Sequence, residues 1–241
     1  GEREASSSAG AGDSDFVDNI WKILKDKGAE VIEFDWTKPE SQEEALAGVK
    51  TVFCSLPHMD TAIDTFSSFI QKCKAHKVEH FVKISFLHNE KYRAEVPFCK
   101  FQFQCDDLLE QAPKSSRISY TILASSHLMT TPLLTQGEGL TKDHKYVTAS
   151  YGMGVDYVSP NDVADAAMVV LLHLKSHRNK VYNLTNIEPV TDRNVAKQLS
   201  KVYGTEIEHV ELGYHDYVEQ LAARNIPSWM SKDAAAFEKM K

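Results

Sequence analysis

The sequence has no run of apolar residues long enough to cross a lipid bilayer, and it has no excess of positive charge. Its 27 basic residues are outnumbered by 34 acidic ones, which gives a net charge of −7. A nucleic acid or an anionic membrane surface would require clustered lysine and arginine. The densest basic cluster, Lys72, Lys74 and Lys77, has the spacing of a solvated helix face. We therefore predict no membrane insertion and no nucleic-acid binding.

Cysteine is scarce, and no two copies have the C-x-x-C spacing of a zinc or redox motif. The four are Cys54, Cys73, Cys99 and Cys105. We expect buried, reduced thiols and a cytoplasmic location. Two histidine pairs have a four-residue separation but lack the glutamate of H-E-x-x-H. These pairs are His76 with His80 and His173 with His177. The sequence therefore predicts no metal site.

What the sequence does contain is a regular alternation of strand-like and helix-like segments. Short apolar or β-branched runs predict strands, and amphipathic stretches between them predict helices. The expected strands are residues 29–34, 49–56, 80–85, 119–124, 181–184 and 207–212. The expected helices are residues 15–27, 41–47, 61–76, 97–111, 160–173, 191–203, 214–225 and 228–240. This alternation predicts an α/β fold, in which a parallel sheet carries helices on both faces.

Local signals set several of these boundaries. Ser41 and Glu44 form a capping-box motif, which predicts the start of the second helix. Pro113 predicts the end of the helix that begins at Pro97, and residues 86–96 are expected to form a loop. Strand 80–85 is central to the prediction, because ligands bind beyond the carboxyl ends of strands in a parallel sheet.

The order of three stretches resembles the NmrA-like family of atypical short-chain dehydrogenases. They are Gly28–Phe53, then His80–Ser85 with Tyr120–Leu123, then Tyr157–Leu171 with Val181–Leu212. The resemblance implies a Rossmann-like sheet with a small C-terminal α/β lobe. The polar, Gly/Ser/Ala-rich composition of residues 1–14 indicates a flexible or tag-like segment. The resemblance divides the rest into a core at 15–136 that lacks its first βαβ half-unit and a substrate-type lobe at 137–241 completing the same domain.

The resemblance also implies NADP or NAD as a possible cofactor and suggests binding residues. Asp35 and Trp36 occupy the position of the adenine end, although Asp35 could equally cap the following turn. Ser55, Leu56 and Pro57 would line the nicotinamide side, or form an ordinary exit from a strand. Ser85 could bond a substrate or the nicotinamide amide, or only satisfy nearby backbone. These residues are the predicted cofactor site.

The sequence departs from the family pattern at three points that carry chemistry. A glycine-rich phosphate-binding turn is missing, since Gly10 and Gly12 follow no strand and Gly152 and Gly154 are interpreted as turn residues.

The second and third departures concern the active site. The Tyr-x-x-x-Lys pair is replaced by Tyr92 and Val96. Where many members keep a lysine or histidine, Gln102 stands with Lys100 nearby. After the strand at 119–124, an arginine and a proline are replaced by Ala124 and Ser125. Only Ser85, Lys100 and Gln102 are left as candidate catalytic residues.

These departures favour a regulatory, binding or structural subunit with weak or no catalysis, a possible pseudoenzyme. The alternative is an NAD(P)H-dependent oxidoreductase that reduces a small carbonyl or quinone. A sheet without its first strands would expose an edge near Ala29 or Thr51, and exposed edges are usually paired or covered. We therefore expect a protein partner or a homo-oligomer. Substrate and cofactor preference are left open by the sequence.

Overall fold

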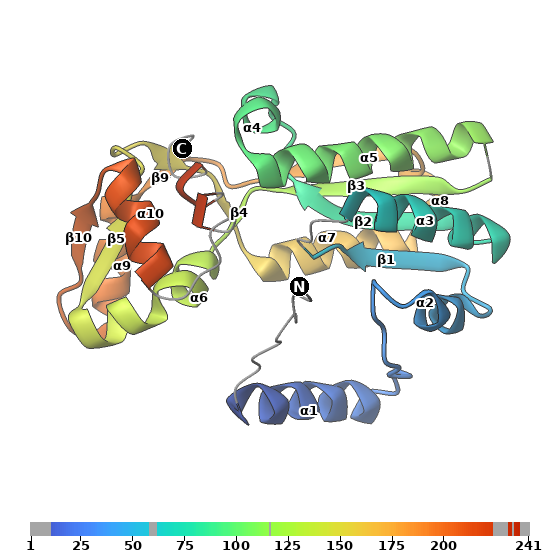
Figure 1. Ribbon diagram of the computed structural model, residues 1–241, viewed down its shortest axis with the longest axis horizontal. Coiled ribbons are helices and arrows are strands. Elements are labelled where there is room, and N and C mark those ends of the chain that lie inside the picture. The colour runs from blue at the N-terminus through green and yellow to red at the C-terminus, as the bar shows by residue number, and fades with distance from the viewer. Residues whose placement is uncertain (1–10, 58–61, 116, 224–230, 233, 237–241) are drawn as a thin grey trace, which may run out of the picture. The chain divides into compact units, whose positions relative to one another are not determined.

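The computed structural model in Figure 1 describes residues 11–57, 62–115, 117–223, 231–232 and 234–236. The chain divides into two compact units, residues 1–47 and residues 48–241. The predicted boundaries at residues 14 and 136 stay predictions.

The first unit contains helix α1 (Ala11–Asp26) and helix α2 (Pro39–Leu46). The strand predicted at residues 29–34 is wrong, because residues 29–35 form neither helix nor strand. Its apolar pattern suits a strand, but a strand needs a neighbour to pair its backbone groups, and no described strand pairs with it.

The capping box predicted at Ser41 is also wrong. Helix α2 begins two residues earlier, with Lys38 at the N-cap and Pro39 in the first turn, where the fixed φ of proline suits a helix. The Ser41 hydroxyl instead accepts a hydrogen bond from the Asp35 N–H at 3.0 Å and lies 2.9 Å from the Lys38 carbonyl. Ser41 thus ties the incoming loop to the helix.

The second unit is built on a parallel sheet with the strand order β1-β2-β3-β8. The strands are β1 (Thr51–Ser55), β2 (His80–Phe86), β3 (Ser119–Ser125) and β8 (Lys180–Leu184). All three pairings are parallel, and β2 pairs with β3 over seven residues. Among the described strands, β1 lies at one edge of this sheet. The predicted parallel sheet is confirmed.

Alternate residues of β2 show that helices cover both faces of the sheet. Phe81 points to one face, where its ring meets Phe66 of α3 at 5.7 Å between centroids. Val82 points to the other face and packs against Ala167 and Val170 of α7. Figure 1 shows α3 and α5 on one side and α7 on the other. These helices are α3 (Ala62–Ala75), α5 (Pro97–Ser115) and α7 (Pro160–Leu172).

Two predictions in this region are wrong. The expected loop at 86–96 contains a short helix, α4 (Glu90–Glu95), whose N-cap Asn89 accepts a hydrogen bond from the Lys91 N–H. Helix α5 does not end before Pro113 but runs on to Ser115. A proline removes its own N–H from a helix and its ring crowds the preceding turn, and Pro113 does so only two residues before the helix ends.

The remaining elements form smaller sheets and helices. Strand β5 (Lys145–Thr148) pairs in parallel with β10 (Glu208–Glu211). The short pairs are β4 (His127–Leu128) with β7 (Tyr157–Val158), and β6 (Gly154–Val155) with β9 (Val190–Thr191). The helices are α6 (Thr131–Glu138), a π-helical turn (Gly139–Asp143), α8 (Leu174–His177), α9 (Asp192–Tyr203) and α10 (Tyr214–Ala223). The helix predicted at 228–240 lies mostly outside the described residues.

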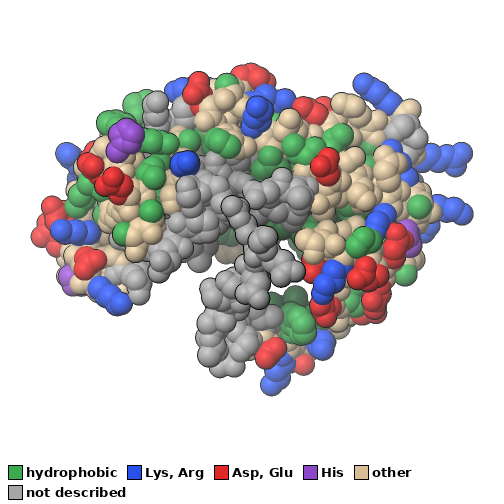
Figure 2. All heavy atoms as spheres, in the orientation of Figure 1, with side chains coloured by type: hydrophobic (Ala, Val, Ile, Leu, Met, Phe, Trp, Pro, Cys, Tyr) green, Lys and Arg blue, Asp and Glu red, His purple; other side chains and the backbone are tan. Residues whose placement is uncertain are grey.

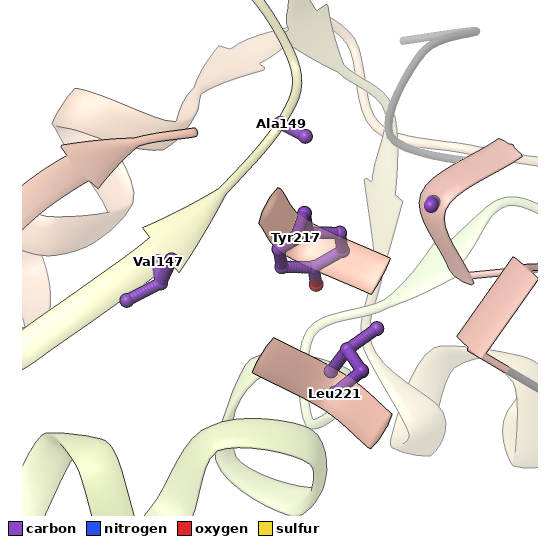
Figure 3. Close-up of a cluster of buried hydrophobic side chains, with 5 residues drawn as sticks. Val147, Ala149, Tyr217 and Leu221 are labelled. Atoms are coloured by element: carbon purple, nitrogen blue, oxygen red, sulfur yellow. The ribbon is translucent and has the colours of Figure 1, made fainter. Parts of the chain in front are cut away.

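Helix α10 packs against β5 through a separate apolar cluster. In Figure 3, Val147 and Ala149 come from β5 and the chain after it, and Tyr217 and Leu221 come from α10. All four are buried. The Gln136 side-chain amide also binds β5. It donates a hydrogen bond to the Val147 carbonyl and accepts one from the Val147 N–H, both at 2.7 Å. Strand β5 is therefore held by a helix side chain as well as by β10.

The two downstream glycines have different roles. Gly152 has φ +75°, as expected of the predicted turn residue. Gly154 lies in β6 instead, and a Cβ added there would come within 2.8 Å of the Pro189 side chain. Its prediction as a turn glycine is wrong, since it allows a close approach of two chain segments.

The first residue of β2, His80, is buried among hydroxyl groups. Its ring nitrogens lie 2.6 Å from the Ser119 hydroxyl and 2.9 Å from the Thr121 hydroxyl. Each hydroxyl also lies near a backbone carbonyl oxygen, Ser119 at 3.0 Å from that of Glu79 and Thr121 at 2.7 Å from that of His177. Burial, together with the nearby charges of Arg178 and His177, lowers the pKa of His80 to about 4.

We expect this histidine to make unfolding easier as the pH falls from about 6.5 to about 4. Over that range the unfolded chain takes up a proton and the folded chain does not, so acid favours unfolding. The loss should approach roughly 3 kcal/mol. Urea denaturation at a series of pH values measures it. A His80→Gln variant cannot be protonated and should lack this part of the slope; equal slopes would contradict the assignment.

Candidate functional site

A cavity of about 370 Å³ lies at the carboxyl ends of three strands of the main sheet. Ser55 and Leu56 reach it from β1, Ser85 from β2, and Ser125 and Ser126 from β3. Parallel strands present their carboxyl ends at the same edge, which is where α/β folds bind ligands. The strand ends form what we call the floor of the cavity.

Aromatic side chains from other elements form the walls of this cavity. They are Phe86, His127, Tyr146, Tyr157 and Tyr217. The His127 ring meets the Phe86 ring edge-on at 5.2 Å between centroids, which orients both rings. A cavity with a polar floor and aromatic walls suits a flat, apolar ligand with a few polar atoms.

Below the floor, a charged network is buried between β2 and α5. Lys83 is fully buried, and its Nζ donates to Asp106 Oδ1 at 2.8 Å and to Gln102 Oε1 at 2.6 Å. The Ser85 hydroxyl donates to Asp106 Oδ2. His88 Nε2 lies 3.0 Å from that same oxygen. Every polar atom of the Asp106 carboxylate therefore has a partner.

The network keeps Asp106 ionised in a buried place. Burial alone would raise the pKa of Asp106, but the Lys83 ammonium and the hydrogen bonds from His88, Lys83 and Ser85 outweigh it and lower the pKa. The Lys83 ammonium also lies 6.0 Å from the centre of the Phe66 ring. The charges of Lys83 and Asp106 cancel, so this pair places no net charge beneath the cavity.

The Ser126 hydroxyl is available to a ligand in the cavity. Ser126 is 2% exposed and lines the cavity, and no described group bonds its Oγ. A buried polar atom without a partner costs free energy, so a ligand that bonds it gains affinity.

The structure brings together some of the predicted site residues. Ser55, Leu56, Ser85 and Gln102 all line the cavity. Pro57, which follows Leu56 in the sequence, is exposed. Lys100, only two residues before Gln102, is exposed and does not line the cavity, because residues two apart on a helix face different directions.

Asp35 and Trp36 lie in the first unit. Asp35 Oδ1 accepts hydrogen bonds from the N–H and the hydroxyl of Thr37, at 2.8 and 2.7 Å. These bonds lower the pKa of Asp35. Trp36 stacks edge-on against Phe34 at 5.0 Å. Asp35 therefore caps the turn that follows it, and a role at the adenine end stays a prediction.

Sequence reasoning missed three members of the buried network: Lys83, Asp106 and His88. A signal was present, because a lysine inside a buried strand needs a buried counter-charge. Gln102 and Asp106 are four residues apart on a predicted helix and so share one face. That face carries the groups that meet Lys83.

Positive charge collects at the opposite end of the sheet. A second hollow of about 740 Å³ lies where the strands begin, and Figure 2 shows Lys and Arg side chains on that side, at the right. Its cationic lining residues are Lys50, Lys74, Lys77, Arg117 and Arg178. In the described part of the chain, no helix is long and apolar enough to span a membrane, and no three potential metal ligands of the His, Cys, Asp or Glu type cluster.

Similar proteins include reductases. The chain is 28% identical over 191 residues to (4-alkanoyl-5-oxo-2,5-dihydrofuran-3-yl)methyl phosphate reductase of Streptomyces griseus, which is 79% of this chain and 64% of that one. It is 25% identical over 207 residues to prestalk A differentiation protein A of Dictyostelium discoideum, and the match covers 83% of this chain and 62% of that one. The chain thus spans less than two thirds of the length of these curated relatives.

Solved structures agree with the fold. Triphenylmethane reductase from Citrobacter sp., solved with NADP(H), is 25% identical, with a TM-score of 0.73 over 90% of this chain and 75% of that one. The NADPH-dependent quinone oxidoreductase QOR2 of Escherichia coli, solved with NADPH, has a TM-score of 0.75 over 90% and 75% at 20% identity, which shows the fold alone.

A family model described as the NmrA-like family matches residues 17–241. The match covers most of the chain and includes every strand of the sheet whose ends form the cavity floor. The protein therefore belongs to the NmrA-like family, as the resemblance of its sequence predicted.

Proposed function

We propose that the chain forms the nicotinamide and substrate end of an NAD(P)H-dependent reductase that acts on flat, apolar carbonyl compounds or quinones. The observation that carries the proposal is the aromatic-walled cavity at the carboxyl ends of β1, β2 and β3. Two of the similar proteins that are at least 25% identical are named as reductases, and this supports the same reaction class here.

The cavity floor fits the nicotinamide end of a dinucleotide by its chemistry. Ser55 and Ser85 offer polar atoms to a carboxamide, and Leu56 and Ile84 offer apolar surface to the ring. When bound, the dihydronicotinamide would supply a hydride. The chain's own residues would orient the ring and keep water from it.

The substrate would take the rest of the cavity. The aromatic walls would pack against a conjugated ring system, and the unbonded Ser126 hydroxyl would bond its carbonyl oxygen. The buried Lys83–Asp106 pair adds no net charge, which favours a neutral substrate over an ionic one.

Titration with NADPH and NADH, followed by turnover with a panel of quinones and aromatic carbonyl compounds, tests the proposal. We expect saturable dinucleotide binding and oxidation of the cofactor in the presence of one class of the panel. A Ser126→Ala variant should bind the substrate about fivefold more weakly, because one hydrogen bond is lost.

Ser150→Ala is the matched control for that variant. Ser150 is also a buried serine whose hydroxyl no described group bonds, but it does not line the cavity. Its substitution should leave substrate affinity unchanged. Equal effects of the two substitutions would remove Ser126 from the substrate site.

A second candidate function is a regulatory or structural subunit with weak or no catalysis. Its supporting observation is Val96, which stands where a Tyr-x-x-x-Lys lysine would follow Tyr92 and is buried against Cys99 and Phe103. Dinucleotide binding without turnover on any panel member would favour this candidate. It also fits a partner protein at the β1 edge, which sedimentation of the purified chain at several concentrations would test.

A further inference from the structure

A continuous line of hydrogen-bonded groups connects the surface to the cavity. The His88 side chain is 27% exposed, and its Nε2 lies 3.0 Å from Asp106 Oδ2. The Ser85 hydroxyl donates to that same oxygen and lines the cavity. Asp106 itself is 1% exposed, so the only parts of this line that meet water or ligand are its two ends.

We propose that His88, Asp106 and Ser85 form a proton relay that delivers a proton from solvent to the oxygen of a carbonyl compound reduced in the cavity. The inference rests on the proposed reductase function and deepens it by assigning the source of the proton. The lysine that assists the tyrosine of a Tyr-x-x-x-Lys pair is absent, because the buried Val96 stands at its position.

As the carbonyl carbon accepts a hydride from the dihydronicotinamide, the electron pair of its C=O bond moves to oxygen. The Ser85 hydroxyl, which donates to Asp106 Oδ2 in the structure, would turn to that oxygen, give it the proton and take another from Oδ2, which in turn would take one from His88 Nε2. His88 regains a proton from water. The net reaction consumes one hydride and one solvent proton and yields an alcohol.

Lys83 serves as a positioning residue in this relay. Its ammonium holds Asp106 Oδ1 at 2.8 Å, which leaves Oδ2 as the oxygen shared by Ser85 and His88. Gln102 accepts a further hydrogen bond from Lys83 and its own Nε2 lies 3.4 Å from the Leu56 carbonyl. The carboxylate therefore cannot rotate without breaking a buried ion pair.

The groups that face His88 make Asp106 its principal charged partner. On the α5 side, the Phe103 ring meets the imidazole edge-on at 5.0 Å. The guanidinium of Arg93, from α4, lies 5.0 Å from the centre of the Phe103 ring and forms an ion pair with Asp107 at 3.1 Å. Lys83 bonds the other oxygen of the Asp106 carboxylate, Oδ1.

Replacing His88 with alanine tests the relay. We expect turnover at neutral pH to fall about a hundredfold, the size of a typical general-acid contribution, while NADPH affinity stays unchanged. Added imidazole should restore part of the lost turnover, which a purely structural role would not allow. His173→Ala, at an exposed histidine after α7, is the matched control and should keep full turnover.

A second readout needs no cofactor. The His88 ring N–H that bonds Asp106 should give a low-field proton resonance, absent in His88→Ala and shifted in Ser85→Ala, because both hydrogen bonds end on one oxygen. A resonance unmoved by Ser85→Ala would overturn the relay.

The outcomes separate the two proposals. If the wild-type chain turns over and His88→Ala retains that turnover, the relay is overturned and the reductase stands. If the wild-type chain reduces no panel member, the reductase proposal fails, and the relay fails with it.

Discussion

Replacing Lys83 with methionine should lower the free energy of unfolding by about 3–5 kcal/mol, because it leaves the Asp106 carboxylate buried without its counter-charge. Methionine fills a similar volume, so the loss reports the charge rather than a cavity. Urea denaturation at neutral pH measures it. The deficit should shrink in acid, since protonation of Asp106 removes the unpaired charge.

Two comparisons make the Lys83 experiment decisive. Lys100→Met removes an exposed lysine from the helix that carries Asp106 and should change stability by no more than about 0.5 kcal/mol. The double variant Lys83→Met with Asp106→Leu removes both charges and should recover much of the loss. If Lys83→Met were as mild as Lys100→Met, the ion pair would not hold β2 to α5 in solution.

Replacing Gln136 with leucine should cost roughly 3 kcal/mol, because both of its bonds to the Val147 backbone are buried. Each bond lost leaves a buried N–H or C=O group unsatisfied. The Val147 amide should also lose its protection from hydrogen exchange, whereas amides in the middle of β2 should keep theirs. Exchange measured by NMR and urea denaturation together provide the test.

Gln136→Glu is a graded control. The carboxylate can still accept from the Val147 N–H but cannot donate to the Val147 carbonyl, so the amide should stay protected while stability falls. Equal protection of the Val147 amide in wild-type and Gln136→Leu proteins would show that β10 alone holds β5.

Much of the central fold could be predicted because its signals are local. The run at 80–85 is short and mostly apolar with two β-branched residues, and the structure pairs it on both sides. Residues 29–34 have a similar pattern but no partner strand, so the same local signal gives no strand there. The residue pattern indicates that a segment could pair as a strand, and the tertiary arrangement decides whether it does.

The cavity floor was predictable for the same reason, and the rest of the site was not. Ser55, Leu56 and Ser85 follow from the rule that ligands bind at strand ends. The walls include Tyr146 and Tyr217, which lie far away in the sequence and meet the floor only through the fold. Lys100 stays an untested candidate, and its exposed side chain does not line the cavity although it is close to Gln102 in sequence.

The cavity draws its floor and its walls from parts of the chain with different tasks. The floor belongs to strands that also hold the core together, so substitutions there risk the fold. Among the walls, His127 is only half-buried in the two-residue strand β4, so a changed side chain there alters the cavity at less cost to the fold than one at the buried Tyr157 or Tyr217. Substrate preference can thus diverge between relatives, or be redesigned by mutating wall residues alone, while the same sheet is inherited unaltered.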